Sequence, residues 1–247
     1  MLKATIDADI FREAIDAISA LVPECRLHTA EDGISTRAVD TANVAMIAIT
    51  LKKEAFDSYK ANASEIGVDI SKMKNIFNMA SKGDLISIEL PDNAQKMAVS
   101  VHGYHYSITL LDTNTIRKDP NSPTINLPGK IVIAGEDLNN AIKAAAVISD
   151  KMALGINTKD QTFFMIADGD TDNIRREFSK DELKSITAME ARSLFSLDYL
   201  KDMGRVMSKA AEVEICLGID HPVKFSFDIA GGNGHVDYLL APRIEAD

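Results

Sequence analysis

The feature of this sequence that most constrains its fold is an internal repeat with an offset of 127 in a chain of 247 residues. A first helix candidate carries apolar residues at helical spacing: Phe11, Ala14, Ile15, Ile18 and Leu21. A shift of 127 places carries these positions onto Leu138, Ala141, Ile142, Ala145 and Ile148. Alternating Ile86, Ile88 and Leu90 likewise meet Val213, Ile215 and Leu217. Agreement of several segments at one offset predicts a duplicated domain.

Each half is predicted to run strand, helix, three strands, a short strand, helix, three strands. The later strands are expected at 46–51, 65–70, 84–90, 96–101 and 105–111, and then at 161–166, 174–178, 186–191, 211–217, 223–229 and 235–240. Ser71 and Asp198 are the N-cap candidates of the second helices. Alternating strands with two helices per half predict an α+β fold in which helices pack on antiparallel sheets.

The segment between the halves, residues 112–129, contains three prolines and few apolar residues. This composition is typical of an extended, exposed linker. The expected domains are therefore 1–111 and 130–247, joined by a connector at 112–129.

The net charge is −10, with 37 acidic and 27 basic residues, which by itself opposes binding to phosphates. The charges are nevertheless segregated, because residues 71–82 carry +3 and residues 198–209 carry +1, so the rest of the chain carries −14. Lys74, Asn78 and Lys82 have i, i+4, i+8 spacing, and their repeat equivalents are Lys201, Arg205 and Lys209.

A basic stripe of this kind is usually only a solvated helix face, but its recurrence at the repeat offset favours one shared surface. The candidate nucleic-acid contacts are Lys72, Lys74, Asn78, Lys82, Lys201, Arg205 and Lys209, with Arg12 and Lys143 on the first helices. No base-reading motif accompanies them. The pattern predicts weak, salt-sensitive, sequence-independent contact with duplex DNA.

Other chemistry finds little support. Cys25 and Cys216 stand alone, as in a reducing compartment, and no stretch is long and apolar enough to span a membrane. We expect a soluble, cytoplasmic protein without metal or cofactor. The acidic run at 168–172 fails as a calcium loop, since Asn173 and Ser179 replace the required Gly and Glu. Nothing in the sequence indicates an enzyme.

Three segments resemble the sliding clamps of the PCNA family. Residues 37–46 are similar to a conserved family segment, Ser196–Leu200 resembles the family's Tyr-Leu helix start, and Tyr238–Glu245 resembles its Leu-Ala-Pro-Lys-Ile-Glu ending. The resemblance runs the length of the chain. The short, acidic form is more similar to the archaeal clamps than to the eukaryotic ones.

This resemblance implies a homotrimeric ring around duplex DNA that serves as a processivity factor in replication and repair. Helices would line the hole, and edge strand His105–Leu111 of one chain would pair with about 171–178 of the next. The implied interface residues are Tyr106, Ile108, Leu110, Ile174, Arg175, Arg176 and Phe178.

Client proteins would dock a short hydrophobic-aromatic peptide motif beside the connector. DNA polymerase, the clamp loader, flap endonuclease and DNA ligase are the implied clients. The implied pocket consists of Val39, Asn43, Val44, Met46, Ile116, Pro120, Pro222, Leu239, Leu240, Ala241 and Pro242.

The chain departs from the family in its first helices, where Arg12 and Lys143 are the main bases in place of lysine pairs. Two alternatives stay open at this point. The chain could be one subunit of a checkpoint-type heterotrimeric clamp, or a duplicated oligomeric enzyme with an acidic surface.

Overall fold

The computed structural model describes residues 1–244 and divides into two compact units. The first comprises residues 1–41, 46–121 and 228–236, and the second comprises 42–45, 122–227 and the residues from 237 onward. The units are not simply the two halves of the chain. Residues 42–45 of the N-terminal half belong to the second unit, and residues 228–236 of the C-terminal half belong to the first. The expected connector is also shared, with 112–121 in the first unit and 122–129 in the second.

In the first unit, the helices are α1 (Ala8–Ser19), α2 (Ile70–Phe77) and a short 3-10 helix η1 (Lys53–Ala55). Its strands are β1 (Leu2–Asp7), β2 (Glu24–Ala30), β3 (Gly33–Val39), β4 (Ala45–Lys52), β5 (Ser58–Ala61), β6 (Ser64–Asp69), β7 (Leu85–Leu90), β8 (Lys96–Val101) and β9 (Tyr104–Thr109). One sheet has the order β5-β1-β7-β8-β9, and β4, β3, β2 and β6 lie side by side in that order.

In the second unit, the helices are α3 (Gly135–Ala145) and α4 (Leu197–Met207). The strands are β10 (Gly129–Ile133), β11 (Lys151–Asn157), β12 (Thr162–Asp168), β13 (Asn173–Phe178), β14 (Ser185–Thr187), β15 (Ala191–Ser196), β16 (Val213–Leu217) and β17 (Val223–Ile229). The last two residues of β17 and the 3-10 turn η2 (Ala230–Gly232) that follows belong to the first unit, and the residues of β18 (Gly234–Leu240) are divided between the units. One sheet has the order β13-β12-β11-β15, and β14, β10, β16 and β17 are neighbours in that order.

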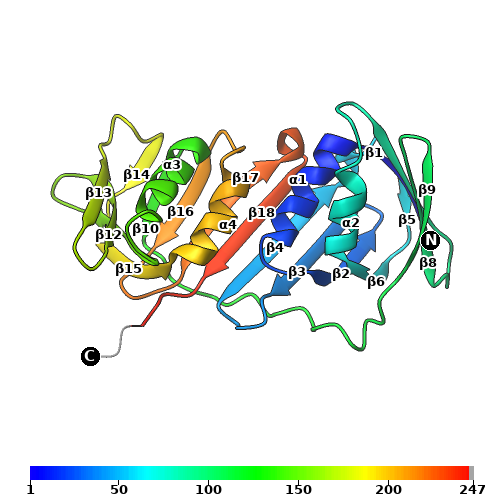
Figure 1. Cartoon of the computed structure of the whole chain (residues 1–247), viewed down its shortest axis with the longest axis horizontal. Coiled ribbons are helices and arrows are strands. Elements are labelled where there is room, and N and C mark those ends of the chain that lie inside the picture. Colours follow the sequence, from blue (N-terminus) through cyan, green and yellow to red (C-terminus); the bar gives the residue numbers. More distant parts are fainter. Residues whose placement is uncertain (245–247) are drawn as a thin grey trace. The chain divides into compact units, whose positions relative to one another are not determined.

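Each unit buries an apolar helix stripe against strands. In the first, Phe11, Ile15 and Ile18 of α1 face Leu27 of β2 and Ile49 of β4, and Phe11 meets Phe77 of α2 edge-on with ring centroids 4.9 Å apart. Figure 1 shows α1 beside α2 and α3 beside α4, each pair lying across strands of its own unit. The predicted α+β class with antiparallel sheets is confirmed.

The repeat also appears in three dimensions. Helices α1 and α3 begin at Ala8 and Gly135, and α2 and α4 begin at Ile70 and Leu197, so both pairs differ by 127. Gly135 shows how closely α3 approaches α4, since a Cβ there would lie 1.9 Å from the Met207 carbonyl oxygen. The equivalent position in the first unit is Ala8, so the two helix pairs pack differently in detail.

Two strand predictions were wrong. The expected strand at 186–191 overlaps only the end of β14 and the first residue of β15, with 188–190 between them, and most of β15 was missed. Strand β5 was also missed, because it is an edge strand of only four residues, too short for its alternation to stand out in the sequence.

The ends of the second helices also differ from the prediction. Asp69 caps α2 by accepting a hydrogen bond from the Lys72 backbone N–H (2.8 Å), so Ser71 lies inside the helix rather than at its cap. Asp198 likewise lies inside α4. Helix α2 ends at Phe77, and Lys82 therefore lies in a later turn beside Gly83, which has a φ of 82°. Lys209 lies two residues beyond the end of α4.

Candidate nucleic-acid and client interfaces

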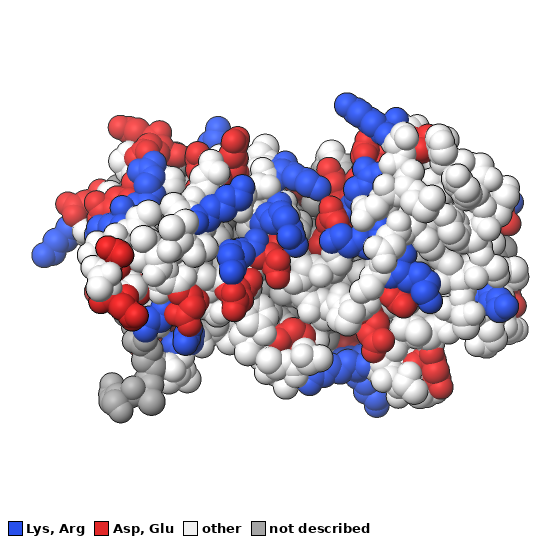
Figure 2. All heavy atoms as spheres, viewed as in Figure 1, with Lys and Arg blue, Asp and Glu red and all other residues white. Residues whose placement is uncertain are grey.

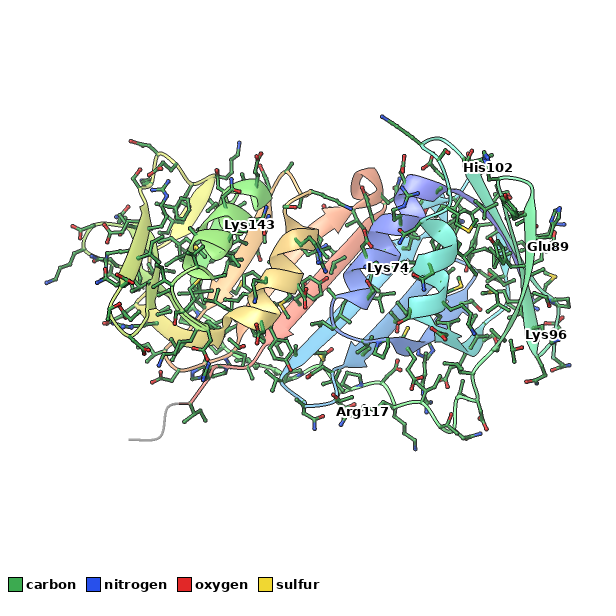
Figure 3. The ribbon with its side chains drawn as sticks, viewed as in Figure 1. Lys74, Glu89, Lys96, His102, Arg117 and Lys143 are labelled. Carbon is green, nitrogen blue, oxygen red and sulfur yellow. The ribbon has the colours of Figure 1, made fainter. Side chains whose placement is uncertain are left out.

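The basic residues of the first unit have two kinds of environment. Met73, Ile76 and Phe77 are buried, which leaves Lys72 and the C-cap residue Asn78 on the exposed side of α2. Lys74 instead reaches across to α1, where its ammonium lies 3.2 Å from Asp16 Oδ1 and donates a hydrogen bond to Ser19 Oγ at 2.9 Å. Figure 3 shows Lys74 between the two helices.

Arg12, predicted to face DNA, holds the end of α2 together. Its guanidinium donates to the carbonyl oxygens of Phe77 (3.1 Å) and Ala80 (2.9 Å) and to Asp9 Oδ1 (2.6 Å). These carbonyls belong to the turn in which the helix stops, where backbone acceptors lack helical partners. Arg12 therefore donates hydrogen bonds to the carbonyl groups at the end of α2, which stops at Phe77, earlier than the sequence pattern predicted.

The second unit presents its bases more openly. Lys143, Lys201, Arg205 and Lys209 are all exposed. Lys201 pairs with Asp198 (2.9 Å) and Arg205 with Asp202 (3.2 Å), each one turn away on the same helix. Surface pairs of this kind contribute about 0–1 kcal/mol and exchange easily with other anions. Lys143 lies on α3. With the Asn139 side-chain amide turned so that its nitrogen donates to the Gly204 carbonyl, its oxygen accepts a hydrogen bond from Lys143 Nζ at 3.3 Å.

Asp16 is a residue that the sequence reasoning missed, although the repeat contained the signal. Its equivalent in the second unit is Lys143, so an acid on α1 corresponds to a base on α3. Lys74 therefore has a carboxylate to meet on its neighbouring helix and Lys201 has none at the equivalent place. Figure 2 shows basic and acidic side chains intermixed on the face that carries the helices.

The client-pocket residues of the first unit are Val39, Met46, Ile116 and Pro120. Val39 and Met46 are register partners across β3 and β4, and both are partly exposed. Ile116 is only 5% exposed and Pro120 is partly exposed. Ile116 therefore attaches the first half of the connector to its unit, while most other residues of 112–121 are exposed, as the linker composition predicted.

The remaining pocket residues belong to the second unit. The backbone N–H of Ala241 donates to the carbonyl of Val44 at 2.9 Å, which fixes the chain after β18 beside the turn that contains Asn43 (φ 59°). Pro222, Leu239, Ala241 and Pro242 are partly exposed. Leu240 is fully buried, so its side chain is part of the core and is not available to a client.

The two strands predicted for the subunit interface both lie at sheet edges, β9 next to β8 and β13 next to β12. On β9, Ile108 is buried and Tyr106 is partly exposed, and the Tyr106 hydroxyl donates to Met79 Sδ at 3.2 Å. Leu110, the residue after the end of β9, is also partly exposed. On β13, Phe178 is buried and Ile174 partly exposed. Arg175 pairs with Glu177 and Arg176 with Glu182, so both arginines already have partners within the chain.

Among residues 1–244, no three His, Cys, Asp or Glu side chains gather as a metal site. Within the same residues, no helix is both long and apolar enough to cross a membrane.

The duplicated α+β units, their paired helices and their open sheet edges define a clamp-type protein. Residues 1–113 match the family model of the N-terminal domain of proliferating cell nuclear antigen. Curated relatives described as DNA polymerase sliding clamps include those of Methanoregula boonei (87% identical) and Methanoculleus marisnigri (65%), each aligned over the whole of both chains.

Among solved structures, A. fulgidus PCNA in complex with the C-terminal region of FEN-1 is 35% identical, with a TM-score of 0.94 and full coverage of both chains. The PCNA of Thermococcus kodakaraensis shares the fold, with a TM-score of 0.90 at 23% identity, over 98% of this chain and 100% of the other. The chain belongs to the PCNA family of archaeal DNA polymerase sliding clamps, which act as processivity factors.

Proposed function

We propose that three copies of this chain close head to tail into a homotrimeric ring around duplex DNA, and that the chain has no catalytic activity of its own. The observation that carries the ring is the pair of open edges on β9 and β13. A head-to-tail contact between two different edges generates a closed ring when its rotation permits.

Hydrogen bonding in the hairpins indicates which backbone groups each edge presents. The Leu110 N–H donates to the Gln95 carbonyl, and pairs alternate along an antiparallel ladder, so His105, Ser107 and Thr109 direct their backbone groups away from β8. The Gly169 N–H donates to the Asp172 carbonyl, which by the same alternation turns Asn173, Arg175 and Glu177 outward from β12. Each edge strand thus has three residues whose backbone groups point outward, so β9 of one copy could form an equal number of backbone contacts with β13 of the next.

The test is a proline at one outward position. Ser107→Pro removes an outward N–H without removing a bond to β8, and proline is tolerated at such edge positions. We expect the unmodified chain to elute as a trimer in size-exclusion chromatography with light scattering, Ser107→Pro as a monomer, and the matched Ser107→Ala as a trimer. A monomeric unmodified chain that needs other subunits to assemble would favour the heterotrimeric checkpoint-type clamp.

The exposed bases on the helices and just beyond their ends support the DNA contact. Lys72, Lys82, Lys143, Lys201, Arg205 and Lys209 would meet phosphates without reading bases, with the second unit contributing the larger share. Lys74 and Arg12 would contribute less, because both already bind groups on neighbouring helices.

The partly exposed apolar residues support a client site. A. fulgidus PCNA binds the C-terminal region of FEN-1, and we propose that this chain binds flap endonuclease in the same way, with DNA polymerase, DNA ligase and the clamp loader using similar peptides. Val39, Met46, Leu239 and Pro242 would supply apolar contacts. Leu239→Ala should weaken binding of a FEN-1 C-terminal peptide, measured by calorimetry, without dissociating the ring, and unchanged affinity would refute the assignment.

A further inference from the structure

Arg26 makes an unusual set of contacts with the first half of the connector. From β2, its Nη2 donates to the carbonyl oxygens of Thr113 (2.6 Å) and Ile116 (3.0 Å), and its Nε donates to that of Arg117 (3.1 Å). Its Nη1 binds Glu65 Oε1 on β6 at 2.8 Å. Four donor contacts of one guanidinium are thereby used, three of them on the backbone of a single five-residue stretch.

The neighbouring side chains reinforce this attachment. His28 lies two residues along β2, on the same outward side, and its Nε2 lies 2.7 Å from Asp119 Oδ2. The guanidinium of Arg117 in turn donates to the carbonyl of Asp40. The Arg26 side chain is only 12% exposed, so its charge is screened from water and its hydrogen bonds are of the stronger, charge-assisted kind. Arg117 marks this part of the connector in Figure 3.

The connector approaches the backbone of β6 closely at Gly67. Leu111 N–H donates to the Gly67 carbonyl on β6 at 2.9 Å. A Cβ at Gly67 would lie 2.4 Å from the Leu111 oxygen and 2.6 Å from Ile116 Cδ1, so glycine is needed for this close approach. Ile116 is consequently buried against β6, and its own carbonyl oxygen is one of those that Arg26 binds.

Comparison with the second unit tests whether the fold itself requires an arginine at the position of Arg26. The equivalents of Arg26, His28 and Glu65 are Ala153, Gly155 and Arg192. The carbonyl of Leu194, equivalent to Gly67, also accepts a backbone bond, from Arg243 N–H at 2.6 Å. The fold therefore repeats the strand-edge contact but not the guanidinium, which shows that Arg26 is not a requirement of the fold.

We propose that Arg26 is a positioning residue for client binding: it fixes the connector segment 113–117 on the first unit and so sets the place of the adjoining client site. This inference rests on the proposed client function. Arg26 itself would not touch the client. Its role is to keep Ile116 and Pro120 in one arrangement, so that a peptide does not have to order the connector when it binds.

The experiment compares the unmodified trimer with Arg26→Gln, Arg26→Lys and the control Lys53→Gln, which removes an exposed charge on η1. Hydrogen exchange would be followed at the hydrogen-bonded amides of Leu111, Asn114 and Thr115. We expect Arg26→Gln to accelerate their exchange about tenfold or more and to leave α1 unchanged. The exchange rates of Arg26→Lys should fall between those of the unmodified chain and Arg26→Gln, because an ammonium cannot reach all three carbonyls.

The second measurement is the affinity of the same variants for a FEN-1 C-terminal peptide. We expect Arg26→Gln to bind it about tenfold more weakly, with Lys53→Gln unchanged and light scattering showing an intact trimer. Unchanged exchange in Arg26→Gln would overturn the anchoring role, and faster exchange with unchanged affinity would overturn the link to clients. If the unmodified chain binds no peptide, the proposed client function itself fails, and the exchange data still decide whether Arg26 anchors the connector.

Discussion

Lys74 and Lys201 occupy equivalent positions in the two repeats but hold different partners. The Lys74 ammonium binds Asp16 and Ser19 on the neighbouring helix, whereas Lys201 pairs with Asp198 on its own helix. The cause lies in the first helices, where both partners of Lys74 differ in the second unit: Asp16 corresponds to Lys143 and Ser19 to Ala146. Both units therefore keep a lysine at this position, but the two lysines differ in how readily they can bind an external phosphate.

This difference predicts unequal contributions to DNA binding. Lys201→Gln should lower the slope of log affinity against log salt concentration by about 0.9 if one phosphate contact is lost, and Lys74→Gln should lower it less. Anisotropy titrations with duplex DNA over a salt series measure both slopes. Asp16→Asn should release Lys74 and strengthen binding, and equal slopes for the two glutamine variants would contradict the asymmetry.

The approach of α3 to α4 predicts that Gly135 cannot be replaced without cost. In Gly135→Ala the new methyl would meet the Met207 carbonyl, a backbone atom that cannot rotate away, and overpacking of this kind costs about 1–3 kcal/mol. Denaturant unfolding would measure the loss. Asn140→Ala, at an exposed position of the same helix, is the control and should unfold at an unchanged or higher denaturant concentration.

The hydrogen bonds of Glu182 predict that stability near β13 depends on pH. Hydrogen bonds from Arg176, and from the Ser179 N–H and hydroxyl, lower the pKa of Glu182 to about 2 from its ordinary 4.5. Because the folded-state pKa is depressed, the stabilisation is present above about pH 4.5 and is lost as the pH falls towards 2. Titration by NMR should show this low pKa. Arg176→Gln should move it upward, and an unmoved pKa in that variant would exclude the arginine as its main cause.

The two thiols are expected to differ in reactivity. Burial raises the pKa of Cys25 to about 12, while burial and the adjacent Glu214 raise the pKa of the half-buried Cys216 less far. Only the thiolate reacts, so at pH 8 a disulfide reagent should modify Cys25 only when the protein unfolds. Mass spectrometry after labelling with and without denaturant checks this. Rapid native labelling of Cys25 would show that the β2 region opens readily.

Much of the architecture followed from local patterns. The 127-residue offset, the buried stripes of the four helices and the edge strands at 104–109 and 173–178 depend on side-chain periodicity, which the sequence records directly. The family resemblance of residues 37–46, 196–200 and 238–245 agrees with the comparisons over the whole chain. Strand β5, with only four residues, was too short for such a pattern to be recognised and was missed.

What the sequence by itself determined is the duplicated fold, its family and the residue types available to each face. Only the tertiary structure decided which of those residues are free to act, because that depends on partners distant in the chain. Arg12 ends α2 by binding carbonyls 65 and 68 residues away, Lys74 is held by Asp16, and Arg26 holds carbonyls 87 to 91 residues further along. Charged side chains satisfy backbone acceptors wherever folding brings them together, and no local pattern encodes that meeting.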